Sequence, residues 1–358
     1  MKMKKYYTSF IIAMFCSFYS INQAVSQDVN FTQFYVVPYQ INPALTGSID
    51  GTYRVGMAYK DQWRGGVDNP YTSTAVGGEV KFDLGTGKKL TDRAGLGLFF
   101  VNDQVNGIAL NTSQISISGA YHKLISKDTK QYIGIGAQIS VFQRNINYDQ
   151  LVFGDEFNQL NEFSETTSEI LPPNNLGFFD MSVGINYHIR PTKATAFFAG
   201  AAIHHITTPN ISFYKNQNNP NPATDLNSQL NARFVGHLSY DQRIADRIIL
   251  SPRVLIQVQG YDTEFRVGTN MKYYLEGYIN ALHFGTYLSM INNVDGFTTN
   301  MLSPLVGFQL KNFLIGVSYD VNLRQTFGGT RGLNSFEVSF RFHGEYYNEN
   351  AGTICPEF

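Results

Sequence analysis

The chain has little cysteine, little charge and no long apolar run, and each shortage excludes a class of protein. Only two of its 358 residues are cysteines, Cys16 and Cys355. Cys16 lies in a segment that we expect to be removed on export, which leaves one cysteine and no intrachain disulfide. The small secreted scaffolds that depend on disulfides are therefore excluded. A structural disulfide would have to be intermolecular.

The low charge points away from a water-covered surface. Charged residues make up 15% of the chain and aromatic residues 14%, whereas a soluble domain usually carries about 25% charged residues. After residue 26 no stretch has the roughly 18 apolar residues of a membrane helix, so a membrane protein with this sequence must cross as strands. The net charge of −1 excludes nucleic acid as an expected partner, because phosphate binding needs clustered Lys and Arg.

Residues 1–26 predict an export signal. Three lysines stand within the first five residues, and residues 10–19 form an apolar stretch too short to span a bilayer. Small side chains at Ala24 and Ser26 occupy the −3 and −1 positions of a cleavage site. We therefore expect an exported chain whose first mature residue is Gln27.

After residue 50 the sequence alternates with a period of two. The odd positions of residues 179–189 are all apolar, while Asp180, Ser182 and Asn186 stand at even positions, and residues 336–343 repeat the pattern. Because a strand points successive side chains to opposite faces, one face is apolar and the other polar. These segments run about 9 to 13 residues, which suits a tilted membrane strand better than a soluble strand of about 5 or 6.

The pattern predicts an all-β transmembrane protein, an antiparallel up-and-down β-barrel of about 14 strands, and bacterial barrels have even numbers of strands. It divides the chain into a signal peptide (1–26), an N-terminal periplasmic segment (27–50), the outer-membrane β-barrel (51–343) and a C-terminal periplasmic tail (344–358). The strands are expected at 51–60, 71–82, 93–102, 109–124, 132–144, 177–190, 193–206, 230–241, 247–258, 263–273, 278–290, 300–310, 313–322 and 335–343.

The connections predict unlike barrel ends. Those after the fifth and seventh strands, 145–176 and 207–229, are long, as are those after the eleventh and thirteenth. Bacterial barrels have short periplasmic turns and long external loops, so we expect the long loops outside and both chain termini in the periplasm. Two features oppose this simple scheme: a short turn near Gly260 on the external side, and Pro252, which donates no ladder hydrogen bond. A longer strand would explain the short turn near Gly260, and a bulge would explain Pro252.

No residue pattern predicts catalysis or a cofactor. The histidines lack metal-ligand spacing, and the adjacent His204 and His205 should point to opposite faces of a strand. There is no G-x-S-x-G elbow. Strand glycines such as Gly95 and Gly136 are not followed by a helix, so we interpret them as sites of bending and close approach. Trp63, the only tryptophan, is either an interfacial anchor or an external contact for a partner.

Several short motifs resemble the PorP/SprF family of type IX secretion outer-membrane proteins, and the resemblance covers the whole mature chain. The motifs are Phe34-Tyr35-x-x-Pro38-x-x-x-Asn42-Pro43-Ala44-x-x-Gly47, Asp61-Gln62-Trp63, Gly316-x-Ser318-Tyr319-Asp320 and Cys355-Pro356-x-Phe358. One departure is visible at residues 334–337, where this chain has Asn-Ser-Phe-Glu in place of an expected Gly-Ser-His-Glu.

The resemblance implies a non-enzymatic component of type IX secretion and gliding motility in Bacteroidetes, one that receives or anchors secreted adhesins through their C-terminal domain. It also implies periplasmic type IX secretion components and outer-membrane lipid as partners, and no cofactor. Within it, residues 42–47 would belong to a periplasmic collar and Trp63 to the opposite rim. An outer-membrane channel for small or hydrophobic solutes is the alternative, because polar inward faces also suit a pore. The partner-binding candidates are Asn42, Pro43, Ala44, Gly47, Trp63 and Cys355.

Overall fold

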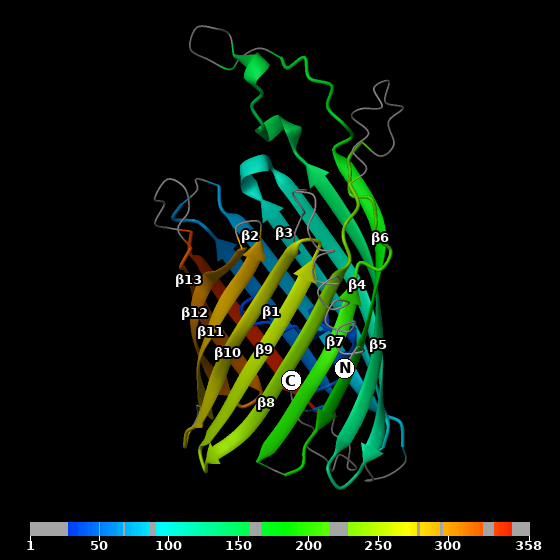
Figure 1. The fold of residues 1–358 in the computed structure, drawn as a ribbon, viewed down its shortest axis with the longest axis vertical. Coiled ribbons are helices and arrows are strands. Elements are labelled where there is room, and N and C mark those ends of the chain that lie inside the picture. The colour runs from blue at the N-terminus through cyan, green and yellow to red at the C-terminus, as the bar shows by residue number, and fades with distance from the viewer. Residues whose placement is uncertain are drawn as a thin grey trace, which may run out of the picture.

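The computed structural model is a closed antiparallel barrel in which neighbouring strands follow the order of the chain and β14 closes on β1 (Figure 1). It describes residues 28–49, 51–66, 69–85, 91–157, 163, 166–192, 194–214, 228–277, 280–293, 296–324 and 333–345. Over these residues the strands are β1 (Tyr53–Gln62), β2 (Tyr71–Asp83), β3 (Arg93–Val105), β4 (Leu110–Ser126), β5 (Gln131–Ile146), β6 (Asn175–Ile189), β7 (Thr195–His204), β8 (Arg233–Ala245), β9 (Ile248–Gln259), β10 (Asp262–Tyr274), β11 (Ala281–Asn293), β12 (Gly296–Leu310), β13 (Phe313–Asn322) and β14 (Ser335–Gly344). The predicted fold and strand number are confirmed.

The strands keep their apolar face outside. Along β6, Phe179 and Ile185 are 47% and 60% exposed, whereas Asp180 and His188 are buried on the inner face. This is the arrangement that the alternation predicted, with apolar side chains toward lipid and polar side chains toward the lumen. Among the described residues, no helix has the length and apolar content needed to cross a bilayer.

The two ends of the barrel differ as expected. One end, called here the loop end, carries the long β5–β6 connection (147–174), whose described residues project far beyond the strands in Figure 1, and the β7–β8 connection (205–232). The other end, called here the turn end, carries short turns, the first residue of β1 and the last residue of β14. The expected long connection after the eleventh strand was wrong, because β11 and β12 continue further than the alternation indicated and pair as far as Asn293 and Gly296, which are separated by only two residues.

The two features that opposed the strand count are accommodated. Gly260, with a φ of +60°, forms a two-residue turn between β9 and β10 at the loop end. Pro252 pairs with β10, but the ladder between β8 and β9 runs to Ser239–Arg253 and resumes at Gln242–Leu250. The proline therefore falls where that ladder is interrupted, so its missing N–H breaks no hydrogen bond there.

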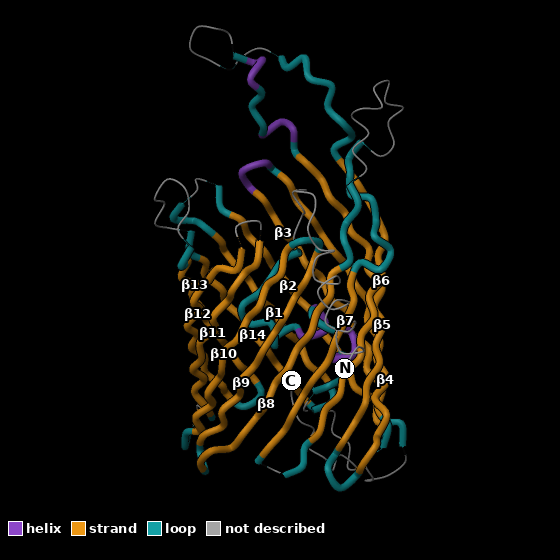
Figure 2. Tube along the Cα trace, in the orientation of Figure 1, coloured by secondary structure: helices purple, strands orange, loops and turns teal. Residues whose placement is uncertain are grey.

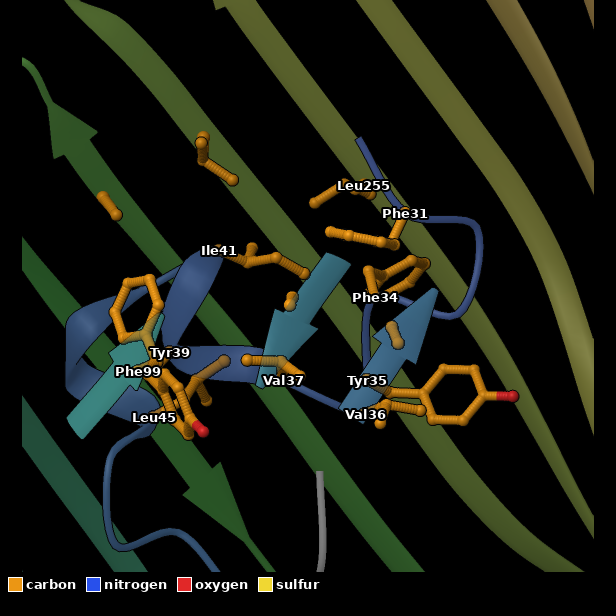
Figure 3. Packing of buried hydrophobic residues seen from close by; sticks show 14 of the residues in the cluster. Phe31, Phe34, Tyr35, Val36, Val37, Tyr39, Ile41, Leu45, Phe99 and Leu255 are labelled. Carbon is orange, nitrogen blue, oxygen red and sulfur yellow. The ribbon is translucent and has the colours of Figure 1, made fainter. Parts of the chain in front are cut away.

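Residues 28–49, called here the lumenal segment, lie inside the barrel (Figure 2). From residue 31 to 49 every residue except Gln40 is buried. The segment contains two 3-10 turns, η1 (Pro38–Gln40) and η2 (Pro43–Leu45), and its aromatic side chains pack with inward residues of the strands, as Figure 3 shows for Tyr39 beside Phe99. The prediction that this part of the chain forms a periplasmic collar was wrong: it fills the lumen, where its apolar side chains are removed from water.

Candidate functional site

Three of the predicted partner-binding residues anchor the lumenal segment to the barrel wall. The Asn42 side chain accepts a hydrogen bond from the Ala44 N–H at 2.9 Å, which starts the η2 turn at Pro43. Its amide nitrogen donates to the Ile185 carbonyl at 2.9 Å and lies 3.0 Å from the His237 imidazole. Asn42, Pro43 and Ala44 are all buried in the lumen, so they contact strands of the same chain rather than lie on a free surface.

Gly47, the fourth of these residues, is required by close backbone approach. Its φ is +77°, and a Cβ atom there would lie 2.7 Å from the Gly95 Cα. Gly136 has the same role further along the wall, since a Cβ on it would lie 2.4 Å from the Ala44 nitrogen. The interpretation of the strand glycines as sites of close approach is confirmed, and what approaches them is the lumenal segment.

Buried carboxylates of the wall hold the segment by its backbone. Glu337 accepts the N–H groups of Thr32 and Gln33 at 2.7 and 2.8 Å. Asp320 accepts the Thr32 hydroxyl at 2.8 Å and pairs with the Lys60 ammonium, also at 2.8 Å. These groups are almost fully buried. Each of these bonds gives a partner to a polar group that would be costly to bury unpaired, so together they fix the segment to the wall.

Asp28, the first described residue of the lumenal segment, is held by ion pairs at the loop end. Asp28 contacts the His205 imidazole at 2.6 Å and the Arg233 guanidinium at 3.1 Å, and the other imidazole nitrogen lies 2.9 Å from Asp180. Burial, together with Arg233, opposes protonation of His205, but the Asp28 carboxylate and the hydrogen bonds to Asp180 and Asp28 outweigh them and raise its pKa to about 9. The histidine is therefore cationic at neutral pH and ties the segment to the start of the β7–β8 connection.

The two adjacent histidines lie closer together than the sequence predicted. His205 has left the strand with a φ of +56°, so its ring and the ring of His204 are both inside, with centroids 6.5 Å apart. The His204 ring lies 2.8 Å from the Ile41 carbonyl. The expectation of opposite faces was wrong because it assumed a regular strand. Within the described ranges no group of three metal-ligating side chains occurs.

A cavity of about 640 Å³, called here the loop-end cavity, lies above the lumenal segment at the loop end. The residues Asp28 to Asn30 form part of its lining, with Lys60, Arg144 and Glu264 from the strands. Trp63 also lines it, with a φ of +67° and its ring 4.8 Å from the ring of Tyr71. The tryptophan thus belongs to the mouth of the barrel.

The described residues of the β5–β6 connection (147–157, 163 and 166–174) form an arm with exposed apolar side chains. Asp155 accepts hydrogen bonds from the Ser168 N–H at 2.7 Å and the Thr167 hydroxyl at 2.9 Å, which ties its two sides together. Phe157 and Phe163 pack on each other yet remain 41% and 57% exposed. The connection has six acidic residues and no Lys or Arg. Exposed aromatic side chains away from lipid are typical of a surface that binds another protein.

Sequence reasoning missed the residues that fix the segment, namely Asp28, His205, Glu337 and Asp320. One signal was available: residues 27–50 contain several aromatic residues and only two charged ones, which suits burial better than exposure to water. Cys355 lies outside the described residues.

Comparison with known proteins agrees with this architecture. The toluene transporter TbuX of Ralstonia pickettii is 10% identical, with a TM-score of 0.50, and the match covers 90% of this chain and 96% of that one. A FadL homologue of Pseudomonas aeruginosa (11% identity, 84% and 92% covered, TM-score 0.45) and CdiB of Acinetobacter baumannii (8%, 81% and 60%, 0.41) also match. No curated protein matches by sequence. Residues 23–342 match the family described as type IX secretion system membrane protein PorP/SprF, and the chain therefore belongs to that family of membrane proteins.

Proposed function

We propose that this protein receives or anchors secreted adhesins at the outer membrane through their C-terminal domain, as a non-enzymatic component of type IX secretion and gliding motility. One observation carries the proposal: the lumen is occupied by the chain's own N-terminal segment, so a partner has to bind at an end of the barrel. The loop end offers a polar cavity and an arm that exposes Phe157 and Phe163.

The proposal includes an orientation in the membrane. Long loops of bacterial barrels face outward and short turns face the periplasm, so the loop end would meet the adhesin and the turn end the periplasmic type IX secretion components. Trp63 would then contact the external partner, and Cys355, in the C-terminal tail, a periplasmic one. Asn42, Pro43, Ala44 and Gly47 would act indirectly by holding the lumenal segment in place. The apolar outer faces of the strands would contact outer-membrane lipid.

The test is deletion of the gene with complementation, read out by protease shaving of intact cells and immunoblotting for large adhesins. Loss of adhesins from the cell surface, restored by the wild-type gene, supports the proposal. Adhesins that still reach the surface and stay attached refute it. A complementing variant with Phe157→Ser and Phe163→Ser should insert normally but fail to retain adhesin.

A solute channel is the competing function, and planar bilayers separate the two. We expect the purified protein to insulate, because the lumenal segment fills the barrel. A steady open conductance would favour the channel.

A further inference from the structure

The wall of the barrel has an open strand edge at the loop end. β6 pairs with β5 from Asn175 to His188, but with β7 only from Val183 to Ile189. β7 ends at His204, and the chain then turns with the left-handed backbone of His205. Within the part of the chain that the structure describes, residues 175–182 of β6 therefore have no strand beside them on that edge.

The backbone hydrogen bonds show which groups point into the open edge. The Asn174 carbonyl accepts from β5, whereas the Met181 carbonyl accepts from the Ile206 N–H and the Phe179 carbonyl from the Thr207 hydroxyl. Since alternate residues of an antiparallel strand bond to opposite neighbours, the N–H and C=O groups of residues 175 and 177 point away from β5. They are an available template for another strand.

This edge lies above the apolar band of the outer surface. The last large apolar side chains that face outward here are Val141 of β5 and Phe179 of β6. Beyond them the outward positions are Gln143 and Gly177, both exposed. Water, and hence a soluble partner, can reach the open edge without entering lipid.

A second feature lies on the inner side of the same edge. A cavity of about 90 Å³ has a mixed lining, with Phe142, Phe178 and Leu230 among its apolar side chains and Asp103, Asp180 and Arg144 among its polar ones; Arg144 also lines the loop-end cavity. An added strand would point alternate side chains toward this space, as β6 itself points Phe178. The cavity therefore offers a place for one side chain of that strand.

Arg144 has no carboxylate partner among the described residues. Its guanidinium donates to the Ile211 carbonyl at 3.3 Å and lies 5.7 Å over the Phe213 ring, and no ion pair includes it. The other arginine that lines the 90 Å³ cavity differs, since Arg233 pairs with Asp28. A half-buried guanidinium without an anion is costly, and a carboxylate satisfies it in bidentate geometry.

We propose that the open edge of β6 binds the extended C-terminal segment of a partner chain as an added strand, with one apolar side chain in the inner cavity and the terminal carboxylate on Arg144. An added strand would lie about 10 Å from β5, two strand spacings away, a distance that an extended arginine side chain and its hydrogen bond to a carboxylate span together. Main-chain pairing gives affinity and the carboxylate fixes the register. The inference rests on the proposed function in one respect: the partner is the secreted adhesin's C-terminal domain.

The test measures binding of an adhesin C-terminal domain from the same organism to the full-length protein in nanodiscs, by biolayer interferometry. Gly177→Pro removes an edge N–H without touching the ladder with β5, and Gly177→Ala keeps it; the nearest atom to a Cβ there is the Phe142 oxygen at 3.8 Å. We expect Gly177→Pro and Arg144→Gln each to weaken binding about tenfold or more, and Gly177→Ala to bind as wild type.

A second arm places six extra residues after the C-terminus of the domain, which moves its carboxylate. The extension should weaken binding to the wild type but cause no further loss with Arg144→Gln. This arm also decides the matter if Gly177→Pro fails to fold. Equal binding by both Gly177 variants, or an extension that binds as tightly as the native terminus, overturns the inference and leaves the proposed function standing. A wild-type protein that binds no such domain overturns both.

Discussion

Replacing Glu337 by alanine should loosen the attachment of the lumenal segment to the wall at Thr32 and Gln33, while the barrel stays folded. The side chain is fully buried and accepts two backbone N–H groups, those of Thr32 and Gln33. Alanine leaves both donors buried without an acceptor, and each orphaned donor costs about 1 to 3 kcal/mol. Attachment at this point should therefore weaken by about 2 to 6 kcal/mol, while the backbone ladders of β14 with β1 and β13 remain.

The assay is hydrogen exchange of the Thr32 and Gln33 amides in detergent or nanodiscs, combined with conductance in planar bilayers. Protection of these two amides should fall by a factor of about 30 or more, while the bilayer conductance stays closed, because the buried apolar side chains still hold the segment in the lumen. Glu276→Ala is the matched control, because that glutamate is exposed at the turn end and pairs only with Arg247 among described residues. Unchanged exchange at both amides in Glu337→Ala would refute the view that wall carboxylates hold the segment.

Three further outcomes are expected. Gly136→Val should prevent correct packing of the lumenal segment, since its Cβ would lie 2.4 Å from a backbone nitrogen, whereas Gly236→Val, with nothing within 4 Å, should fold normally; heat-modified mobility in gels checks this. Because the folded-state pKa of His205 is raised to about 9, its ion pair with Asp28 should be intact below about pH 6.5 and weaken as pH rises through 9; His205→Gln should abolish that dependence of exchange at residues 28–30. Trp63 fluorescence should be quenched by aqueous acrylamide but not by brominated lipids, and the reverse would place its ring at the interface.

The strands could be predicted from the sequence because their signal is local. In residues 179–189 the polarity of each side chain indicates which face of the strand it occupies. The structure has the same alternation of exposed and buried side chains from Phe179 to His188. The ends of the strands were harder to predict. β11 and β12 extend past their predicted ends, because polar residues such as Asn292 pair in a ladder as well as apolar ones do.

The site could not be predicted because its contacts are distant in the sequence. Asp28 and His205 are 177 positions apart, and Thr32 and Glu337 are 305 apart. No period or spacing links such residues. The Asn-Pro-Ala motif stood out in the sequence as a candidate for partner binding, but its position was predicted wrongly: Asn42 bonds to the backbone of β6 inside the lumen. Only the low charge and high aromatic content of residues 27–50 indicated burial.

The lumenal segment is better explained as a fixed core of the barrel than as a gate. Its large apolar side chains are buried, and exposing each to water would cost about 1.5 to 3 kcal/mol, before the bonds to Glu337, Asp320 and Glu79 are broken. Nine such side chains lie between residues 31 and 49, so ejection would cost more than about 10 kcal/mol. A ligand can shift an equilibrium only by its differential affinity for the two states, and about 12 kcal/mol is the whole binding energy of a nanomolar complex. If the binding of a partner had to drive the opening of the lumen, almost no net free energy of binding would remain. Binding at the loop end uses surfaces that already exist, so no free energy is needed to displace the segment. We therefore assign the function to the rim and the open edge of β6 rather than to the pore.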